Sequence, residues 1–242
     1  MSDPAAELAG RLATGADLAG DDDERTPSRR MAAALRSLIA EFVAAELPAE
    51  QLEEAITAID ALQRSVARAP RRPARWQAPP PDGRRGGPSD WLPVGGACNP
   101  VAPPVTMRVD GDVVVGEVVY GAAYEGPPGC VHGGMIAAAF DEVLGIAQSL
   151  SGHFGMTGGL SIRYVRPTPL HVPLRVIGRY ERSEGRKIYT AGNVEVDGQV
   201  TATAEAIFIA LDEERFQRVA AAARGDVPQG VTGAGGAGLS AG

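Results

Sequence analysis

A glycine- and proline-rich loop followed by a helix carries the residues of this sequence that could do chemistry. The loop covers residues 126–134 and ends in His132, Gly133 and Gly134, and the helix after it contains Asp141. Free N–H groups at a helix N-terminus can stabilise a developing oxyanion. A carboxylate can serve as a base or as a nucleophile. The pattern therefore indicates acyl transfer.

The spacing of these groups bears on where an active site can form. Asp141 follows Gly133 by eight residues, which is about 12 Å along a helix. A carboxylate and an oxyanion donor that act on one carbonyl must both lie within about 3 Å of the reacting atoms. If both groups take part, they come from different subunits. This predicts a homo-oligomer with active sites at the interface, two per dimer.

The elements around the loop predict an α+β fold. The strand order is two strands, the helix, and then four strands with short turns, including Asp110-Gly111 and Asp197-Gly198, so the sheet is antiparallel. The helix, over 133–150, is apolar on nearly every side and should be buried by a sheet wrapped around it. The expected strands cover residues 105–109, 112–120, 159–166, 174–181, 187–196 and 199–211.

Two acidic residues stand out on the predicted central helix. Asp141 and Glu142 fall among apolar side chains, where an unpaired carboxylate costs several kcal/mol. Such groups are enriched at functional sites. The alternative is structural: with Gln148 and Ser149 they would mark a narrow wet stripe on the helix.

The segments outside this domain are simpler. Residues 1–26 are predicted to be disordered, and 27–68 to form a helical hairpin with one apolar face per helix. That face must be buried against the main domain or against a second copy. Residues 69–90 are a Pro/Arg-rich linker. After the domain at 91–212, residues 213–242 hold a helix end and a Gly/Ala-rich disordered tail.

Composition excludes several classes of protein. The net charge of −7 over 242 residues argues against nucleic-acid binding. The two cysteines and three histidines have no metal-binding spacing, so no metal is expected. Two scattered cysteines indicate reduced thiols and a cytoplasmic protein. No apolar run is long enough for a membrane span, and no secretory signal is expected.

Four motifs stand together in this sequence: residues 128–134, Asp141 nine residues after His132, Met156-Thr157, and residues 163–170. Together they resemble those of hotdog-fold acyl-CoA thioesterases, in particular the PaaI-like (phenylacetate-pathway type) branch of the 4-hydroxybenzoyl-CoA thioesterase superfamily. The similarity spans about residues 95–212. It implies a hotdog fold, in which a curved antiparallel sheet grips a long helix, and pairing of two such units edge to edge into a homodimer or homotetramer.

The resemblance also implies roles for individual residues. The amide of Gly133, with Gly134 beside it, would polarise the thioester carbonyl. His132 would orient the loop or donate a hydrogen bond near the carbonyl. Asp141 would be the nucleophile or the general base for water, and Thr157 would help to hold that water.

Basic side chains could bind the coenzyme A part of such a substrate. Guanidinium and ammonium groups are natural partners of phosphates, although a solvated sheet edge would show the same residues. The candidates are Arg163, Arg166, Arg186 and Lys187. No cofactor is expected, because coenzyme A belongs to the substrate.

The resemblance implies hydrolysis of an acyl-CoA thioester to a free acid and coenzyme A. An enoyl-CoA hydratase or dehydratase of the same fold is an alternative enzyme. A non-catalytic acyl-CoA-binding scaffold is an alternative outside catalysis. The acyl group itself cannot be read from these motifs.

Overall fold

The computed structural model describes residues 26–71, 88–103 and 105–211. Most of the predicted disordered segment 1–26 and of the predicted linker, and the whole predicted C-terminal segment 213–242, lie outside these ranges. None of the helices within these ranges is long and apolar enough to cross a membrane.

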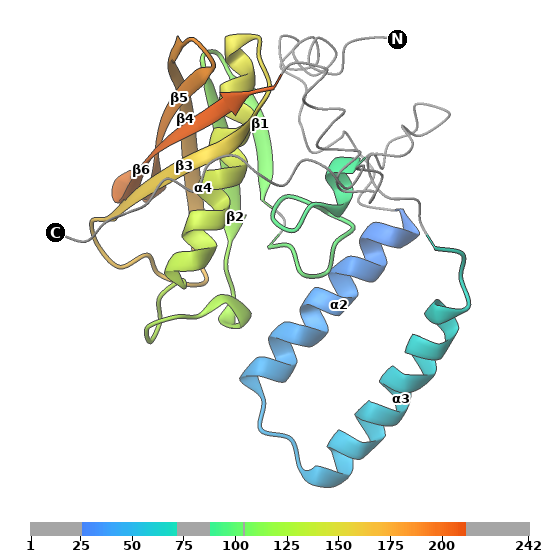
Figure 1. Cartoon of the computed structure of the whole chain (residues 1–242). Coiled ribbons are helices and arrows are strands. Elements are labelled where there is room, and N and C mark those ends of the chain that lie inside the picture. The colour runs from blue at the N-terminus through green and yellow to red at the C-terminus, as the bar shows by residue number, and fades with distance from the viewer. Residues whose placement is uncertain (1–25, 72–87, 104, 212–242) are drawn as a thin grey trace, which may run out of the picture. The chain divides into compact units, whose positions relative to one another are not determined.

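A six-stranded antiparallel sheet forms the main body (Figure 1). The spatial order of the strands is β1-β2-β4-β5-β6-β3, so β1 and β3 are the edge strands. Each expected strand is present, which confirms the antiparallel sheet. The strands are β1 (Thr106–Asp110), β2 (Val113–Val119), β3 (Gly155–Tyr164), β4 (Pro173–Glu184), β5 (Lys187–Val196) and β6 (Gln199–Ala210).

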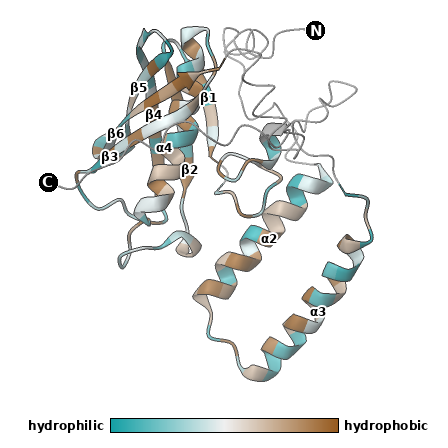
Figure 2. Ribbon diagram, viewed as in Figure 1, coloured by the Kyte–Doolittle hydropathy of each residue, from teal (hydrophilic) through white to brown (hydrophobic). Residues whose placement is uncertain are grey.

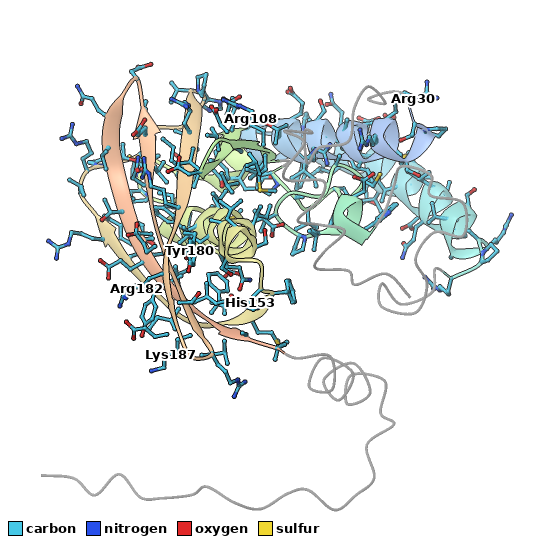
Figure 3. All side chains as sticks on the ribbon, turned by 90° about the horizontal axis from the view of Figure 1, so that it is seen from above. Arg30, Arg108, His153, Tyr180, Arg182 and Lys187 are labelled. Carbon is cyan, nitrogen blue, oxygen red and sulfur yellow. The ribbon has the colours of Figure 1, made fainter. Side chains whose placement is uncertain are left out.

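Helix α4 (Gly133–Ala147) lies in the hollow of the curved sheet, as Figure 3 shows nearly end-on. A 3-10 turn, η3 (Gln148–Ser151), continues it. Glycines let the helix approach closely, since a Cβ at Gly116 or Gly178 would lie 2.8 or 3.0 Å from Val143. The helix and sheet form one core, which confirms the predicted α+β hotdog fold. The buried side chains of α4 are Ile136, Ala139, Phe140, Val143, Leu144 and Ala147.

The opposite side of α4 is open to solvent in the single chain. Gly134 and Asp141 are exposed, so the prediction of a helix buried all round is wrong for this side. The sheet wraps only the face that carries the large apolar residues. Since small and polar residues line the remaining side, its exposure costs little.

Edge strand β3 begins at Gly155, earlier than the glycine-rich sequence suggested. Gly155 pairs with Ala210 of β6, and the register shifts between Thr157 and Gly159. This β-bulge adds a residue to the edge strand. Apolar side chains are exposed along and just beyond the strand, with Met156, Tyr164 and Val165 each 51% exposed.

Two helices precede the sheet, as predicted: α2 (Pro27–Ala44) and α3 (Ala49–Ala67). The side chain of Thr26 caps α2 by accepting a hydrogen bond from the Arg29 N–H at 3.3 Å. Helix α2 ends at Ala44, and Pro48, which disfavours helical geometry for the residue before it, separates the two helices.

The apolar faces of α2 and α3 are exposed within the described residues. Figure 2 shows apolar and polar residues alternating along both helices. Burial of these faces by the main domain is therefore not found, and burial by a second copy stays a prediction. The exposed side chains include Leu38, Ile39, Phe42, Val43, Ile56, Ile59, Leu62 and Val66.

Two arginines fasten α2 to the segment that leads into the sheet. Arg29 pairs with Asp90 at 3.3 Å. Arg36 donates to the carbonyls of Asn99 at 3.0 Å and Ala97 at 3.4 Å. Burial lowers the pKa of the Arg36 guanidinium, against the opposing influence of Tyr124 and Cys98. Helix α2 also lies beside the 3-10 turn η2 (Ala122–Tyr124), which precedes the glycine-rich loop.

Replacing Arg36 with methionine is expected to lower the free energy of unfolding by about 1–2 kcal/mol, because charged donors to two carbonyls are lost. Methionine keeps an unbranched apolar chain in place of the apolar part of the arginine side chain. Urea denaturation measures the stability, and amide hydrogen exchange should speed up in residues 26–44. Arg30→Met, at an exposed position of the same helix, is the control. Equal losses in both variants would show that Arg36 does not hold α2.

Candidate active site

His132 fixes the junction between the glycine-rich loop and α4. It is the N-cap residue, and its Nδ1 accepts a hydrogen bond from the Gly134 N–H at 3.0 Å. Its own N–H donates to the Tyr124 carbonyl at 2.9 Å. One residue earlier, the Val131 N–H donates to the Thr168 carbonyl at 2.8 Å. The loop is therefore held from both sides, and the start of the helix is fixed.

This cap gives the N–H groups of Gly133 and Gly134 different hydrogen-bonding states, which the sequence alone could not distinguish. The Gly134 amide is occupied by His132, whereas the Gly133 N–H has no partner in the described part of the chain. An amide in the first helical turn has no intrahelical acceptor, and the helix dipole adds positive potential there. Gly133 is thus the donor that remains available to a ligand.

The cap also defines the neutral form of the His132 ring. Because Nδ1 accepts a hydrogen bond, the proton of the neutral imidazole resides on Nε2. His132 is exposed. It can therefore offer an N–H donor to a ligand beside the Gly133 amide.

Asp141 and Thr157 form the second part of the candidate site. The Thr157 hydroxyl, from the start of β3, donates to Asp141 Oδ1 at 2.8 Å. Both residues are exposed, so Asp141 is not a carboxylate in apolar surroundings, as its neighbours in sequence had suggested. Its second oxygen and the hydroxyl lone pairs can accept hydrogen bonds from a water molecule. The structure brings this predicted pair together.

Tyr164 is a site residue that sequence reasoning did not assign. Its hydroxyl donates to the Gly133 carbonyl at 2.8 Å. The strand alternation after the bulge places Leu160, Ile162 and Tyr164 on the face toward α4. That alternation could have marked Tyr164 as facing the helix, but not which carbonyl it meets.

A second tyrosine supports the same helical turn from the interior. Tyr120 is 1% exposed, and its hydroxyl donates to the Met135 carbonyl at 3.2 Å. Its ring packs edge-on against Tyr124 at 5.4 Å. Burial raises the pKa of the Tyr120 phenol, so this hydroxyl remains a donor. Tyr120 and Tyr164 therefore both hold the first turn of α4 by donating hydrogen bonds to its carbonyl groups.

The two parts of the candidate site lie at opposite ends of the same strand. Thr157, near the start of β3, contacts Asp141, and Tyr164, at its end, contacts Gly133. The strand and α4 therefore run antiparallel. Eight residues of helix hold the two groups about 12 Å apart within one chain.

The four basic candidates form two pairs, one at each end of β6. Arg163 is opposite Thr203, and Arg166 donates to Gln199 Oε1. Lys187, labelled in Figure 3, is opposite Ile209. The six residues from 203 to 209 span about 20 Å, so one chain does not bring the pairs together.

Two further observations concern the contact that Arg186 makes and the face of the sheet on which Arg163 lies. Arg186 donates to the Ala210 carbonyl at 3.4 Å, beside Lys187 at the end of the sheet that carries Thr157. Arg163 alternates with Tyr164 along β3 and therefore lies on the face away from α4. Lys187 lies on the same outer face, because it alternates with the buried Ile188 along β5.

Comparisons with known proteins find thioesterases among the relatives of this chain. The family model described as "Thioesterase superfamily" matches residues 128–203. The protein named acyl-coenzyme A thioesterase THEM4 of Bos taurus is 36% identical over 97 residues, which are 39% of this chain and 40% of that protein. THEM4 of Xenopus laevis is 34% identical over 93 residues, 38% of this chain and 42% of that protein. The chain thus matches less than half the length of these curated relatives.

A solved structure matches much more of the chain. A crystal structure described as that of a thioesterase superfamily protein is 32% identical and aligns with a TM-score of 0.68. The alignment covers 81% of this chain and 96% of the other. The identity of 32% extends over nearly all of that protein and accompanies the same fold. The chain therefore belongs to the thioesterase superfamily.

Proposed function

We propose that this protein hydrolyses an acyl-CoA thioester to a free acid and coenzyme A, in active sites shared between two subunits. The observation that carries the proposal is the layout of the edge strand. An exposed carboxylate held by Thr157 lies at one end of β3, and the unpartnered Gly133 amide lies at the other. The names of the THEM4 relatives support the substrate class.

The edge position of β3 supports the shared site. In the described chain β3 pairs only with β6, so one edge of its backbone is open. An open edge readily pairs with a second strand. Two-fold antiparallel pairing of β3 with its copy would set the Thr157 end of one strand against the Tyr164 end of the other. Asp141 of one protomer would then approach the partner's Gly133.

The same pairing would gather the basic residues. Arg186 and Lys187 lie at the Thr157 end of the sheet, and Arg163 and Arg166 at the Tyr164 end. Antiparallel pairing places one end beside the other across the two-fold axis. Each site would then have basic groups from both protomers nearby, which suits the phosphates of coenzyme A.

The chemistry needs a carbonyl polariser and a delivered hydroxyl. Asp141 takes a proton from a water molecule held with Thr157, and the water oxygen bonds to the thioester carbon. The carbonyl oxygen becomes an oxyanion that accepts a hydrogen bond from the Gly133 N–H of the other subunit. Collapse breaks the C–S bond, and the coenzyme A thiolate takes the proton back from Asp141. Direct attack by the Asp141 carboxylate is the alternative first step.

The first experiment is a hydrolysis panel of straight-chain acyl-CoAs from short to long, together with aryl-CoAs. We expect thiol release, followed with a thiol reagent, for at least one class. The protein's own thiols, Cys98 and Cys130, which are not joined in a disulfide, require a blank without substrate. The same panel narrows the acyl preference, which the geometry does not fix. No thiol release from any member would overturn the proposal.

The alternatives give different results once an enoyl-CoA is added to the panel. An enoyl-CoA hydratase would remove enoyl absorbance without releasing thiol. A scaffold would bind acyl-CoA in calorimetry with neither change. Placement in the PaaI-like branch and a cytoplasmic location stay predictions from the sequence.

A further inference from the structure

Tyr164 is joined to His132 through a single peptide group. The Tyr164 hydroxyl donates to the Gly133 carbonyl at 2.8 Å. The N–H of that same peptide group belongs to Gly134 and donates to His132 Nδ1 at 3.0 Å. One planar amide therefore receives a hydrogen bond at its oxygen and gives one at its nitrogen.

Hydrogen bonds in such a chain strengthen one another. Donation to the carbonyl draws electron density toward oxygen and makes the N–H a better donor. The Gly134 N–H then holds Nδ1 more firmly, which keeps the His132 proton on the exposed Nε2. The same contact fixes the Gly133–Gly134 peptide group at the start of α4. The unpartnered Gly133 N–H belongs to the peptide group directly before it.

Packing of the Tyr164 ring adds to this constraint. A Cβ at Gly133 would lie 3.2 Å from the Tyr164 hydroxyl oxygen and 3.3 Å from Cζ. The ring is therefore seated against the backbone of Gly133, and a side chain there would push it away. The Tyr164 side chain is therefore held at Gly133 by packing as well as by its hydrogen bond.

We propose that Tyr164 is a positioning residue of the active site: through the Gly133–Gly134 peptide it sets the His132 ring and the Gly133 amide that meet the thioester carbonyl. This inference rests on the proposed hydrolysis. Tyr164 itself does not contact the reacting atoms. It acts on the transition state through the two donors that it holds, so its loss lowers kcat and leaves KM unchanged.

Tyr164→Phe tests the proposal because it removes only the hydroxyl. We expect kcat to fall about five- to tenfold, the effect of one ordinary hydrogen bond. The control is Tyr189→Phe, whose lost hydroxyl donates to Glu184 at 3.2 Å. Tyr189 alternates with the buried Ile188 and lies on the outer face of the sheet. The control should keep wild-type kcat.

Nuclear magnetic resonance of the full chain supplies a second readout. In Tyr164→Phe the amide proton of Gly134 should move upfield as its hydrogen bond weakens, and the His132 side-chain nitrogens should shift toward a mixture of tautomers. Tyr189→Phe should leave both signals in place. A lower kcat with unchanged Gly134 and His132 signals would overturn the proposal, as would a wild-type kcat.

A double-mutant cycle connects the hydroxyl to the backbone. Gly133→Ala should cost less in the Tyr164→Phe background than in the wild type, because both changes break the same contact. Additive losses would count against the link. If the wild-type protein hydrolyses no acyl-CoA, the proposed function fails and the positioning role fails with it. The spectra would still report whether the hydrogen-bonded chain exists.

Discussion

Replacing Asp141 with asparagine is expected to lower kcat for acyl-CoA hydrolysis by about 10²–10⁴-fold, the usual contribution of a positioned base. The asparagine carbonyl can still accept the Thr157 hydrogen bond, so the local geometry survives. What is lost is the ability to take a proton from water or to attack the thioester. Asp141 is exposed, so the fold and the oligomer should be unaffected.

Thiol release under saturating substrate measures the effect, with circular dichroism and size-exclusion chromatography as checks on folding and assembly. Asp60→Asn is the matched control, because it makes the same change at an exposed helical position in α3. Asp141→Asn with activity near that of the control would remove Asp141 from the mechanism.

Isotope labelling separates the two roles of Asp141. A single turnover of wild-type protein in ¹⁸O-water places the label in the released acid if water attacks directly. If the carboxylate attacks and water then adds to the Asp141 carbonyl of the mixed anhydride, the label stays in Asp141, so label found there by mass spectrometry of the protein identifies the carboxylate as the nucleophile.

Regular elements were the most predictable part of this protein. The strand at Lys187–Val196 was predicted with its observed bounds, because Gly185 and Asp197-Gly198 mark turns on both sides. The Gly/Pro-rich loop predicted where α4 begins. The motifs implied that Asp141 and Thr157 act on the same water molecule, and the two side chains are joined by a hydrogen bond. These features depend on local sequence or on motifs, and both can be read from one sequence.

Other features depend on tertiary packing and could not be predicted. The β3 start was missed because Gly155, Gly158 and Gly159 weaken any strand pattern, and a bulge breaks the alternation. The exposure of Asp141 depends on which side of α4 the sheet covers. The Tyr164 contact with Gly133 depends on how β3 crosses the helix, which no spacing in the sequence reports.

Removing the Gly133 amide is expected to lower kcat about 10²–10³-fold, the cost of losing one oxyanion donor. Gly133→Pro achieves this with little damage to the helix. Gly133 is the first residue of α4, and proline is favoured at that position because its missing N–H has no intrahelical partner. His132 has φ −59° and ψ 132°, the extended geometry that a residue before proline adopts.

Gly133→Ala is the control for steric effects. It keeps the amide and adds the same Cβ beside the Tyr164 ring, so the difference between the two variants isolates the donor. We expect only a severalfold loss of kcat in Gly133→Ala. Equal kcat in the alanine and proline variants would eliminate the Gly133 amide as the oxyanion donor.

Hybrid dimers then test whether the two groups come from different subunits. Asp141→Asn and Gly133→Pro subunits are each nearly inactive, but a shared site lets a hybrid assemble one site from the intact Asp141 and the intact Gly133. Random mixing in equal amounts makes half of the dimers hybrid, so activity should return to about a quarter of wild type. A mixture of wild type with Asp141→Asn should retain about half and serves as the mixing control. If each chain held its own complete site, well-mixed hybrids would stay inactive, because every subunit would lack either its base or its oxyanion donor.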